Sequence, residues 1–289
     1  MNIAFIGAGK VGRSFGYYLK TKGFNIVGYM SKSRESEEIA ANETGSSPLT
    51  KEEVLKKAEI IIITTPDTEI EKVCDDVSKS VGFDKDHLVV HMSGGLSSKI
   101  LSSAREQGAS IFSLHPLQSF AKVEKAREEL KNTFFAMEGE GDKEKLVSIL
   151  DKIQNPYVEI DSEKKSLYHG AAAIASNYLV ALTNVVLKLL QDCGFNRADA
   201  LKVTGNLMQG TLNNVKEYDT VEALTGPIVR GDVNMVQHHL DELKKHNYDR
   251  ILEIYRLLGE ETVEIACSRG LSSDKAARLI ESLKGQDNL

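Results

Sequence analysis

Cysteine is scarce in this chain of 289 residues, and the few cysteines present stand far apart. Only Cys74, Cys193 and Cys267 occur. Their spacing fits neither a disulfide framework nor a metal-binding motif. We therefore expect no metal site, and a reducing compartment such as the cytoplasm is the simplest location for the protein.

An excess of basic charge is also missing. The sequence has 36 Lys and Arg against 42 Asp and Glu, a formal net charge of −6. Because nucleic-acid-binding proteins depend on a basic surface, we expect no nucleic-acid partner. The first residues lack the positively charged segment followed by an apolar segment that is typical of a signal peptide, so we expect no secretory signal.

Long apolar runs are few, and the longest is interrupted by polar side chains. Residues 170–187 are uncharged and mostly apolar, but they include Ser176, Asn177, Thr183 and Asn184. A basic flank of the cytoplasmic type is absent as well. This pattern favours a helix buried in protein over a membrane span.

Residues 1–16, MNIAFIGAGKVGRSFG, are the most informative stretch. Ile3 to Ile6 predict a short strand, and a G-x-G-x-x-G motif follows it and opens a helix. In this context the first glycine permits a tight turn, the second leaves room for a pyrophosphate, and the third lets helix and strand pack closely. Free N–H groups at the helix N-terminus favour phosphate. The predicted dinucleotide contacts are Gly7, Gly9, Lys10, Val11 and Gly12. The alternative is a tight turn without a ligand.

The end of the second predicted strand, residues 24–30, bears on which dinucleotide is bound. NAD-preferring sites carry Asp or Glu there to hold the ribose hydroxyls, whereas this chain has Tyr29 and Met30. The hydroxyls and cations that follow suit a 2′-phosphate, so we favour NADP over NAD. The alternative is a solvated basic turn. The predicted 2′-phosphate contacts are Ser31, Ser33 and Arg34, with Lys32 beside them.

Further strands are predicted at residues 59–64, 88–91, 110–114, 133–137 and 157–160. Ligands of open α/β sheets bind at the carboxyl ends of parallel strands, where small and polar residues collect in this chain. We expect the nicotinamide near the residues that follow three of these strands, although His115 could simply bond to the backbone. These residues are Thr65, Pro66, Ser93, Gly94 and His115.

The pattern changes after Asp161, since almost no strand signal remains. A helix is predicted over residues 162–192, and its apolar residues spread widely enough to suggest burial on most sides. Further helices are predicted near 197–216, 232–245, 247–268 and 273–284. The sequence therefore predicts an α/β, parallel-sheet domain (1–161) followed by an all-helical domain (162–289), with a small-molecule site in the cleft between them.

Two segments of the helical domain carry candidate chemistry. Lys165 and His169 share a helix face, and Asn177 lies close to the same face. A lysine and a histidine in a cleft could polarise a carbonyl and protonate the alkoxide formed by hydride addition. The alternative is a helix start with a solvated lysine. Thr225 and Arg230 could hold a carboxylate or phosphate, and Gln118 is a further candidate substrate contact.

Several motifs together resemble one family, the Rossmann-like oxidoreductases with a helical C-terminal domain of unknown function. The similarity spans roughly residues 1–285. The matching pieces are Gly7 to Gly12, Thr65-Pro66-Asp67, His91-Met92-Ser93-Gly94, His115 to Phe120, Lys165 to His169, Ser176 to Leu179, Leu224 to Pro227, and Arg230-Gly231-Asp232.

More distantly, the layout is similar to the superfamily of 6-phosphogluconate dehydrogenase, ketopantoate reductase and pyrroline-5-carboxylate reductase. Hydroxyacid members carry a catalytic Lys, matched by Lys165, and an Asn four residues later, where this chain has His169. Some members resemble an alternative type of ketopantoate reductase. The resemblance implies NADPH-dependent reduction of 2-dehydropantoate to pantoate and a homodimer built through the helical domain.

Two other functions stay open. One is reduction of a cyclic imine such as pyrroline-5-carboxylate, which needs less help from a lysine acid because a protonated imine already accepts hydride. The other is a non-catalytic NADP(H)-binding protein that regulates a partner, which would keep the glycine loop without needing Lys165.

Overall fold

The computed structural model describes residues 1–285, and its contacts divide the chain into two compact units. The first runs from Met1 to Tyr178, and the second begins at Leu179. The last strand ends at Glu159, so the change from α/β to helical structure occurs where the sequence predicts it. The division between the compact units falls later than residue 161, because the start of the long helix packs with the first unit.

The first unit is built around one eight-stranded sheet with the order β3-β2-β1-β4-β5-β6-β7-β8. Neighbouring strands are parallel except β6 and β7, which are antiparallel. The sequence pattern predicts seven of these strands and misses β3. The strands are β1 (Asn2–Ile6), β2 (Asn25–Met30), β3 (Ser47–Pro48), β4 (Ile60–Ile63), β5 (Leu88–His91), β6 (Ser110–Pro116), β7 (Phe135–Glu140) and β8 (Tyr157–Glu159).

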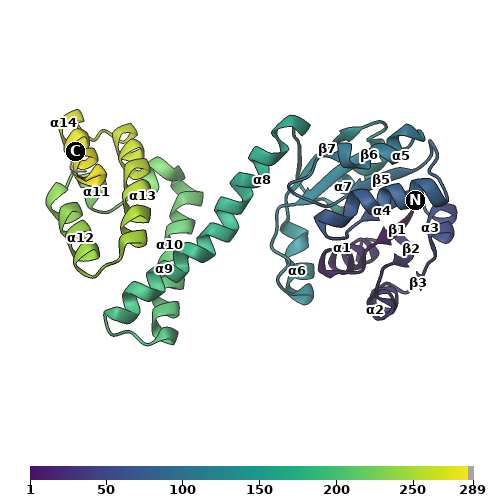
Figure 1. The fold of residues 1–289 in the computed structure, drawn as a ribbon, viewed down its shortest axis with the longest axis horizontal. Coiled ribbons are helices and arrows are strands. Elements are labelled where there is room, and N and C mark those ends of the chain that lie inside the picture. Colours follow the sequence, from purple (N-terminus) through teal and green to yellow (C-terminus); the bar gives the residue numbers. More distant parts are fainter. Residues whose placement is uncertain (286–289) are drawn as a thin grey trace. The chain divides into compact units, whose positions relative to one another are not determined.

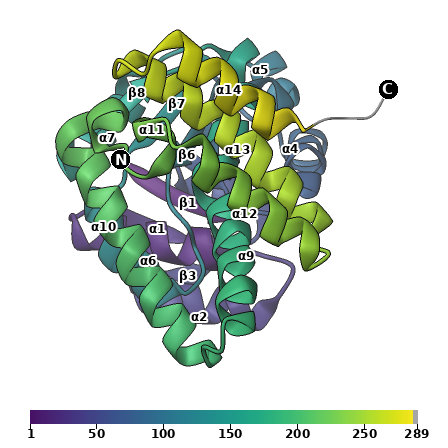
Figure 2. The same cartoon turned by 90° about the vertical axis from the view of Figure 1, so that its left-hand side faces the viewer.

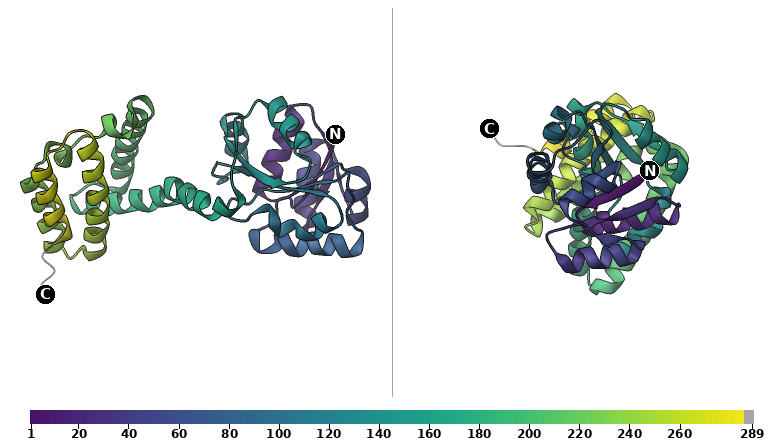
Figure 3. Two further views of the ribbon diagram at one scale, coloured as in Figure 1. Left: turned by 90° about the horizontal axis from the view of Figure 1, so that it is seen from above. Right: turned by 90° about the vertical axis from the view of Figure 1, so that its right-hand side faces the viewer.

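Helices cover both faces of this sheet, as Figure 3 shows. The four isoleucines of β4 explain why: Ile60 and Ile62 enter one apolar core, whereas Ile61 and Ile63 enter the other. Helices α1, α2 and α7 contribute to the first core, and α3, α4 and α5 to the second. The helices are α1 (Lys10–Thr21), α2 (Arg34–Thr44), α3 (Lys51–Lys57), α4 (Asp67–Ser80), α5 (Ser102–Glu106), α6 (Val123–Glu129) and α7 (Glu144–Ile153), with 3₁₀ turns η1 (Ser98–Leu101), η2 (Leu130–Asn132) and η3 (Ser162–Lys164).

In its described residues the second unit consists of helices joined by short turns. Its core lies among α11 to α14 and includes Val236, Leu252, Val263 and Leu279 (Figure 1). Figure 2 shows α9 and α10 joined by a turn, which contains Gly194 at a φ of +93°. The helices are α9 (Leu179–Asp192), α10 (Arg197–Ala223), α11 (Pro227–Arg230), α12 (Val233–Lys245), α13 (Asp249–Ser268) and α14 (Ser273–Lys284).

The long helix differs from the sequence expectation in its burial. It comprises α8 (Lys165–Ala173), a π-helical turn η4 (Ile174–Tyr178) and α9. Of these residues only Lys165 and Leu187 are buried in the chain. Apolar residues spread around a helix predict that something covers it, but the pattern is the same whether the cover is its own chain or another molecule.

By length and composition alone, the helical stretch Ser162–Asp192 could cross a membrane, and it is the one such stretch in residues 1–285. A single stretch of this kind is weak evidence for a membrane span, because helices that protein covers have the same composition. The sequence interpretation, a helix covered by protein, therefore stays a prediction.

Candidate functional site

The glycine loop between β1 and α1 has the geometry that its sequence predicts. Gly7 has a φ of +114°, and a Cβ on it would lie 2.7 Å from the Thr64 carbonyl carbon. A Cβ on Gly12 would lie 2.5 Å from the Gly7 carbonyl oxygen. The Thr64 hydroxyl donates to that same oxygen at 2.8 Å, which ties the loop to the end of β4. Gly9, in contrast, faces open space, since nothing lies within 4 Å of a Cβ built there.

A cavity of about 520 Å³ adjoins this loop at the carboxyl ends of β1, β2 and β4. Helix α1 begins beside it with no side chain capping its N-terminus, so its first N–H groups are available to an anion. The buried Thr65 hydroxyl has no hydrogen-bond partner among the described residues. The open Gly9, the uncapped helix and this hydroxyl fit a dinucleotide pyrophosphate. The cavity lining includes Gly7, Gly9, Ser31, Lys32, Ser36, Lys51, Thr65, Pro66 and Glu69.

A carboxylate that the sequence interpretation does not include lies against the loop after β2. Glu37, in the first turn of α2, is buried and accepts a hydrogen bond from the backbone N–H of Ser31. Ser33 caps α2 by accepting from the Ser36 N–H at 3.2 Å. The exposed Arg34 pairs with Glu38, 2.8 Å away, and its guanidinium lies 3.9 Å from Glu37. The predicted 2′-phosphate contacts are therefore close together, but Arg34 already has acidic neighbours.

Two lysines at this cavity form ion pairs with α4. Lys32 pairs with Glu69, and Lys51 pairs with Asp76. Lys32 and Lys72 together lower the pKa of the Glu69 carboxyl to about 2. The sequence interpretation includes Lys32 but misses Ser36, in the first turn of α2, and Lys51, because α3 is distant in sequence from β2. Both lysines supply positive charge to a cavity that suits a phosphate ligand.

The second group of candidate residues surrounds a polar row that crosses three strands. His91 of β5 pairs in register with Ser113 of β6, and Ser113 pairs with Glu138 of β7. All three are buried, and Lys165 from the first turn of α8 lies against them. The Lys165 Nζ donates to the Ser113 hydroxyl at 2.6 Å and lies 3.9 Å from Glu138. Glu138 in turn accepts from the backbone N–H and the hydroxyl of Ser98, at 2.7 and 2.8 Å.

Burial shifts the protonation equilibria of this row. Desolvation lowers the pKa of Lys165 to about 8, although the nearby Glu138 acts in the opposite direction. Desolvation and the Lys165 charge lower the pKa of His91 to about 3 and that of His115 to about 4. At neutral pH the Lys165 side chain is therefore an ammonium, and the neighbouring imidazoles of His91 and His115 are neutral.

Three of the predicted nicotinamide residues, Ser93, Gly94 and His115, lie at the adjoining ends of β5 and β6, whereas Thr65 and Pro66 follow β4. The Ser93 hydroxyl already has partners, because it donates to Asp67 of α4 at 2.8 Å and accepts from two backbone N–H groups of its own loop. Gly94 separates two imidazoles: a Cβ on it would lie 2.7 Å from His115 Nε2 and 2.7 Å from His169 Nδ1. The Tyr168 hydroxyl lies 2.6 Å from the other ring nitrogen of His115. The first unit thus brings together Lys165, His169, Gly94 and His115, and their roles in binding and catalysis stay predictions.

The remaining predicted residues are not part of this cluster. Gln118 donates to the Ala126 carbonyl at 2.9 Å and accepts from the Thr133 hydroxyl, so it holds the loop after β6. Asn177 is an exposed residue of η4. Thr225 and Arg230 belong to the second unit, where they flank and end α11. Their roles as substrate contacts stay predictions.

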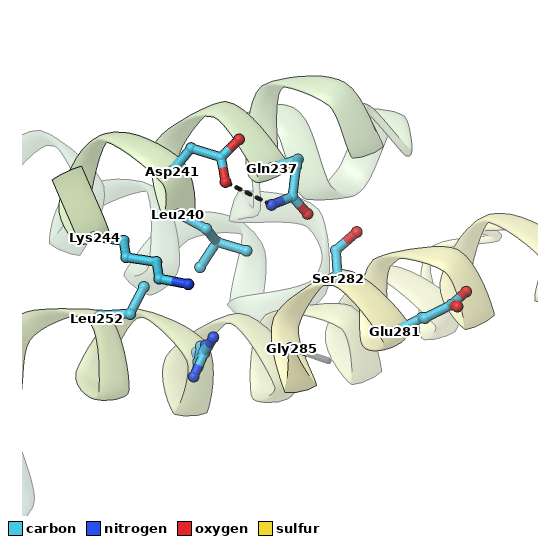
Figure 4. A pocket seen from close by; sticks show the side chains of 9 residues that line it. Gln237, Leu240, Asp241, Lys244, Leu252, Glu281, Ser282 and Gly285 are labelled. Carbon is cyan, nitrogen blue, oxygen red and sulfur yellow. Dashed lines mark hydrogen bonds between the residues drawn. The ribbon is translucent and has the colours of Figure 1, made fainter. Parts of the chain in front are cut away.

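The second unit has a polar cavity of its own, also of about 520 Å³, between α12, α13 and α14 (Figure 4). Gln237 donates to Asp241 at 2.9 Å on one of its walls. Lys244 and Glu281 place opposite charges around it. None of the predicted site residues lines it, so it does not belong to the candidate site.

Ser113, Glu138 and Tyr168 are residues that the sequence interpretation misses. Ser113 carries a signal, since it is a polar residue inside a predicted strand. Its link to Lys165 and Glu138 does not show in the sequence, because the register of β6 and β7 creates it. Tyr168 gives no such signal, because a tyrosine on a helix that also carries apolar residues is typical of packing.

Comparisons with known proteins agree with this architecture. A family model described as a Rossmann-like domain matches residues 1–116, and a domain of unknown function, DUF2520, matches residues 133–262. No curated protein matches the chain in sequence. The Rossmann-like fold and the helical domain of unknown function that the motifs indicate are therefore confirmed.

Solved structures extend the similarity over almost the whole chain. Protein TM1727 from Thermotoga maritima is 29% identical, with a TM-score of 0.70, over 91% of this chain and 98% of that one. A candidate NADP oxidoreductase from Bacteroides fragilis, BF3122, is 23% identical with a TM-score of 0.69 and the same coverage. Pyrroline carboxylate reductase from Plasmodium falciparum, solved with NADP bound, is 15% identical with a TM-score of 0.58, over 97% of this chain and 100% of that one. The chain thus shares its fold with these solved structures, with a Rossmann-like domain at residues 1–116.

The two glycines of the loop should respond differently to an added methyl group. Gly12→Ala places a Cβ against backbone, so we expect it to lower the free energy of unfolding by about 1–3 kcal/mol. Gly9→Ala meets open space at a φ of −78°, so we expect a loss below about 1 kcal/mol. Urea denaturation followed by circular dichroism measures both. Equal losses of stability in the two variants would contradict the distinction between Gly12, which packs against backbone, and Gly9, which faces open space.

Proposed function

We propose that this protein is an NADPH-dependent reductase that transfers a hydride to the carbonyl carbon of a small 2-oxo acid, with 2-dehydropantoate as the leading candidate. The observation that carries the proposal is the buried Lys165, placed with His115 at the same sheet edge as the open glycine loop. The strands β1, β4, β5 and β6 are successive parallel neighbours, so their carboxyl ends share that edge.

Bound NADPH would supply the hydride. Gly7 to Gly12 and the start of α1 would hold its pyrophosphate, and the hydroxyls and cations after β2 would hold its 2′-phosphate. The Lys165 ammonium stabilises the negative charge that develops on the substrate oxygen. Either the buried Lys165 or the exposed His169 would deliver the final proton. Asn177, Gln118, Thr225 and Arg230 stay candidate substrate contacts, each argued from the sequence alone.

Reduction of a cyclic imine is the second candidate. It is supported by the similarity in fold to the pyrroline carboxylate reductase, and a carbon–nitrogen double bond accepts hydride by the same geometry. A panel of 2-oxo acids and cyclic imines, each with NADPH and with NADH, tests both candidates through the loss of reduced-cofactor absorbance. Turnover of imines alone would overturn the 2-oxo acid assignment. Tight NADPH binding without turnover of any compound would favour the regulatory alternative.

We also propose that two copies of the chain form a homodimer through the helical domain. The helices α8, η4, α9 and α10 expose large apolar side chains, and patches of this kind on soluble proteins mark interaction surfaces. A second copy of the chain would cover them, and a sedimentation measurement of the mass in solution tests this. The exposed residues include Leu167, Ile174, Tyr178, Val180, Leu201 and Leu207.

Removing one cation from the loop after β2 should separate the two cofactors. Arg34→Ala or Lys32→Ala should weaken NADPH binding by about 10- to 100-fold, since a charge-assisted contact contributes about 1.5–3 kcal/mol. NADH lacks the 2′-phosphate, so its binding should stay nearly unchanged. Fluorescence titration with both cofactors measures this, with Lys56→Ala on α3 as a control for net charge.

Added salt should reduce the preference for NADPH, because both cations are exposed. Equal losses for NADPH and NADH would overturn the assignment of this loop. A wild-type protein that prefers NADH would indicate that the Glu37 carboxylate, rather than the cations, selects the cofactor.

The charge of Lys165 should set the alkaline limit of the reaction. Its pKa is about 8, and reduction needs the ammonium, so kcat/KM for reduction should fall as the pH rises above about 8. Lys165→Met should lower kcat by about 10²- to 10⁴-fold, the usual contribution of a positioned acid. The neighbouring exposed Lys164→Met is the matched control. Full activity of Lys165→Met, with an unchanged pH profile, would exclude this role.

A further inference from the structure

Tyr168 and His115 form a close pair that the proposed mechanism does not use. Tyr168 lies one helical turn after the start of α8, and His115 is the penultimate residue of β6. The Tyr168 hydroxyl and the His115 Nδ1 are 2.6 Å apart, and the two rings are almost perpendicular, at 85°. The contact therefore fixes the orientation of the imidazole as well as engaging one of its nitrogens.

The protonation of the pair follows from its surroundings. Burial and the Lys165 charge lower the pKa of His115 to about 4, and burial raises the pKa of Tyr168 to about 12. The other titratable groups nearby are His169 on the same helix, His91 on β5 and Glu138 on β7. At neutral pH the pair thus holds one phenolic proton and one ring proton. The 2.6 Å distance fits a hydrogen bond in either direction, and we take the phenol as the donor because it is the stronger acid of the two groups.

If the phenol donates to Nδ1, the ring proton of His115 is on Nε2. That nitrogen lies close to Gly94, since a Cβ built on Gly94 would come within 2.7 Å of it and of His169 Nδ1. Because Gly94 lies in the loop after β5, the Nε2–H group lies at the carboxyl ends of β5 and β6, which is the edge of the proposed reaction.

We propose that Tyr168 is a positioning residue that holds His115 as the Nε2–H tautomer, so that His115 donates a hydrogen bond to the oxygen of the substrate carbonyl. This inference rests on the proposed reductase function. When bound, NADPH would supply the hydride to the carbonyl carbon, and the electron pair of the C=O π bond would move to the oxygen. His115 stabilises that oxygen and keeps its own proton, while Lys165 or His169 provides the proton that completes the alcohol.

The chain contains a matched control for this pair outside the site. In the second unit the Tyr255 hydroxyl lies 2.8 Å from His239 Nδ1, with the rings at 87°. Tyr255→Phe thus removes a phenol from the same kind of pair outside the cluster of Lys165, His115 and His169. Tyr168→Phe and Tyr255→Phe both keep the ring, so circular dichroism should show an intact fold for each.

The tautomer itself can be measured by ¹⁵N NMR of the histidine rings, with the His115 signals assigned by their loss in His115→Gln. In the wild type we expect the Nε2–H form, and in Tyr168→Phe a mixture of tautomers, whereas Tyr255→Phe should leave His115 unchanged. An Nδ1–H form in the wild type, or the same tautomer in Tyr168→Phe, would overturn the inference. Because this readout needs no turnover, it decides the role of Tyr168 even if no substrate of the panel is reduced.

Kinetics provide the second readout. Tyr168→Phe should lower kcat by about 10- to 100-fold, the usual effect of losing the partner that orients a functional histidine. The KM for NADPH should change by less than about twofold, because the phenol has no role in cofactor binding. Tyr255→Phe should leave both constants unchanged. A loss of activity of equal size in both variants would show a general effect of the substitution and would contradict the proposal.

Discussion

The enclosed ammonium of Lys165 is the constraint on which the candidate site depends. A lysine with 2% of its surface exposed is tolerated only where hydrogen bonds and an opposite charge replace water. Ser113 and Glu138 provide them, and Ser98 holds the Glu138 carboxylate in turn. Because these partners lie on β6, β7 and η1, the first turn of α8 has to lie against that region of the sheet. Desolvation, together with this cation, lowers the pKa of His91 and of His115 and keeps both imidazoles neutral.

The glycine loop imposes a second constraint at the same edge of the sheet. Gly7 and Gly12 approach so closely, with Thr64 bonded between them, that α1 has to leave the sheet directly after β1. This arrangement leaves the N-terminus of α1 uncapped beside Gly9. The edge thus attracts an anion at β1, whereas at β5 and β6 it offers a cation and neutral hydrogen-bond donors. Such a pair of environments suits a charged dinucleotide together with a substrate that gains negative charge as it reacts.

Most of the fold could be predicted from local patterns, because they reflect local physics. The isoleucine run of β4 has one explanation, a strand covered on both faces, and the glycine motif has a spacing that fixes a turn. Tertiary features were less accessible. The reversed direction of β7 leaves no trace in composition, and the two residues of β3 are too few for a pattern. Burial of the long helix was predicted wrongly for the single chain, because an apolar pattern does not identify the molecule that covers it.

The candidate site shows the same division. Lys165 and His169 could be found because a helical spacing of four places them on one face. Ser113 and Glu138 could not, since their partner is fifty-two residues from one and twenty-seven from the other, and only the register of β5, β6 and β7 aligns them. Glu37 was missed for a related reason: α2 folds back so that its first turn meets the backbone of Ser31.

The cluster in the first unit has a consequence for specificity. An ammonium and an imidazole N–H would stabilise negative charge on any carbonyl oxygen and contribute little to distinguishing one 2-oxo acid from another. Discrimination of that kind comes from groups that contact the rest of the substrate. On the proposed function, the ammonium and the imidazole would therefore determine the type of reaction, and residues outside this cluster would determine which substrate undergoes it.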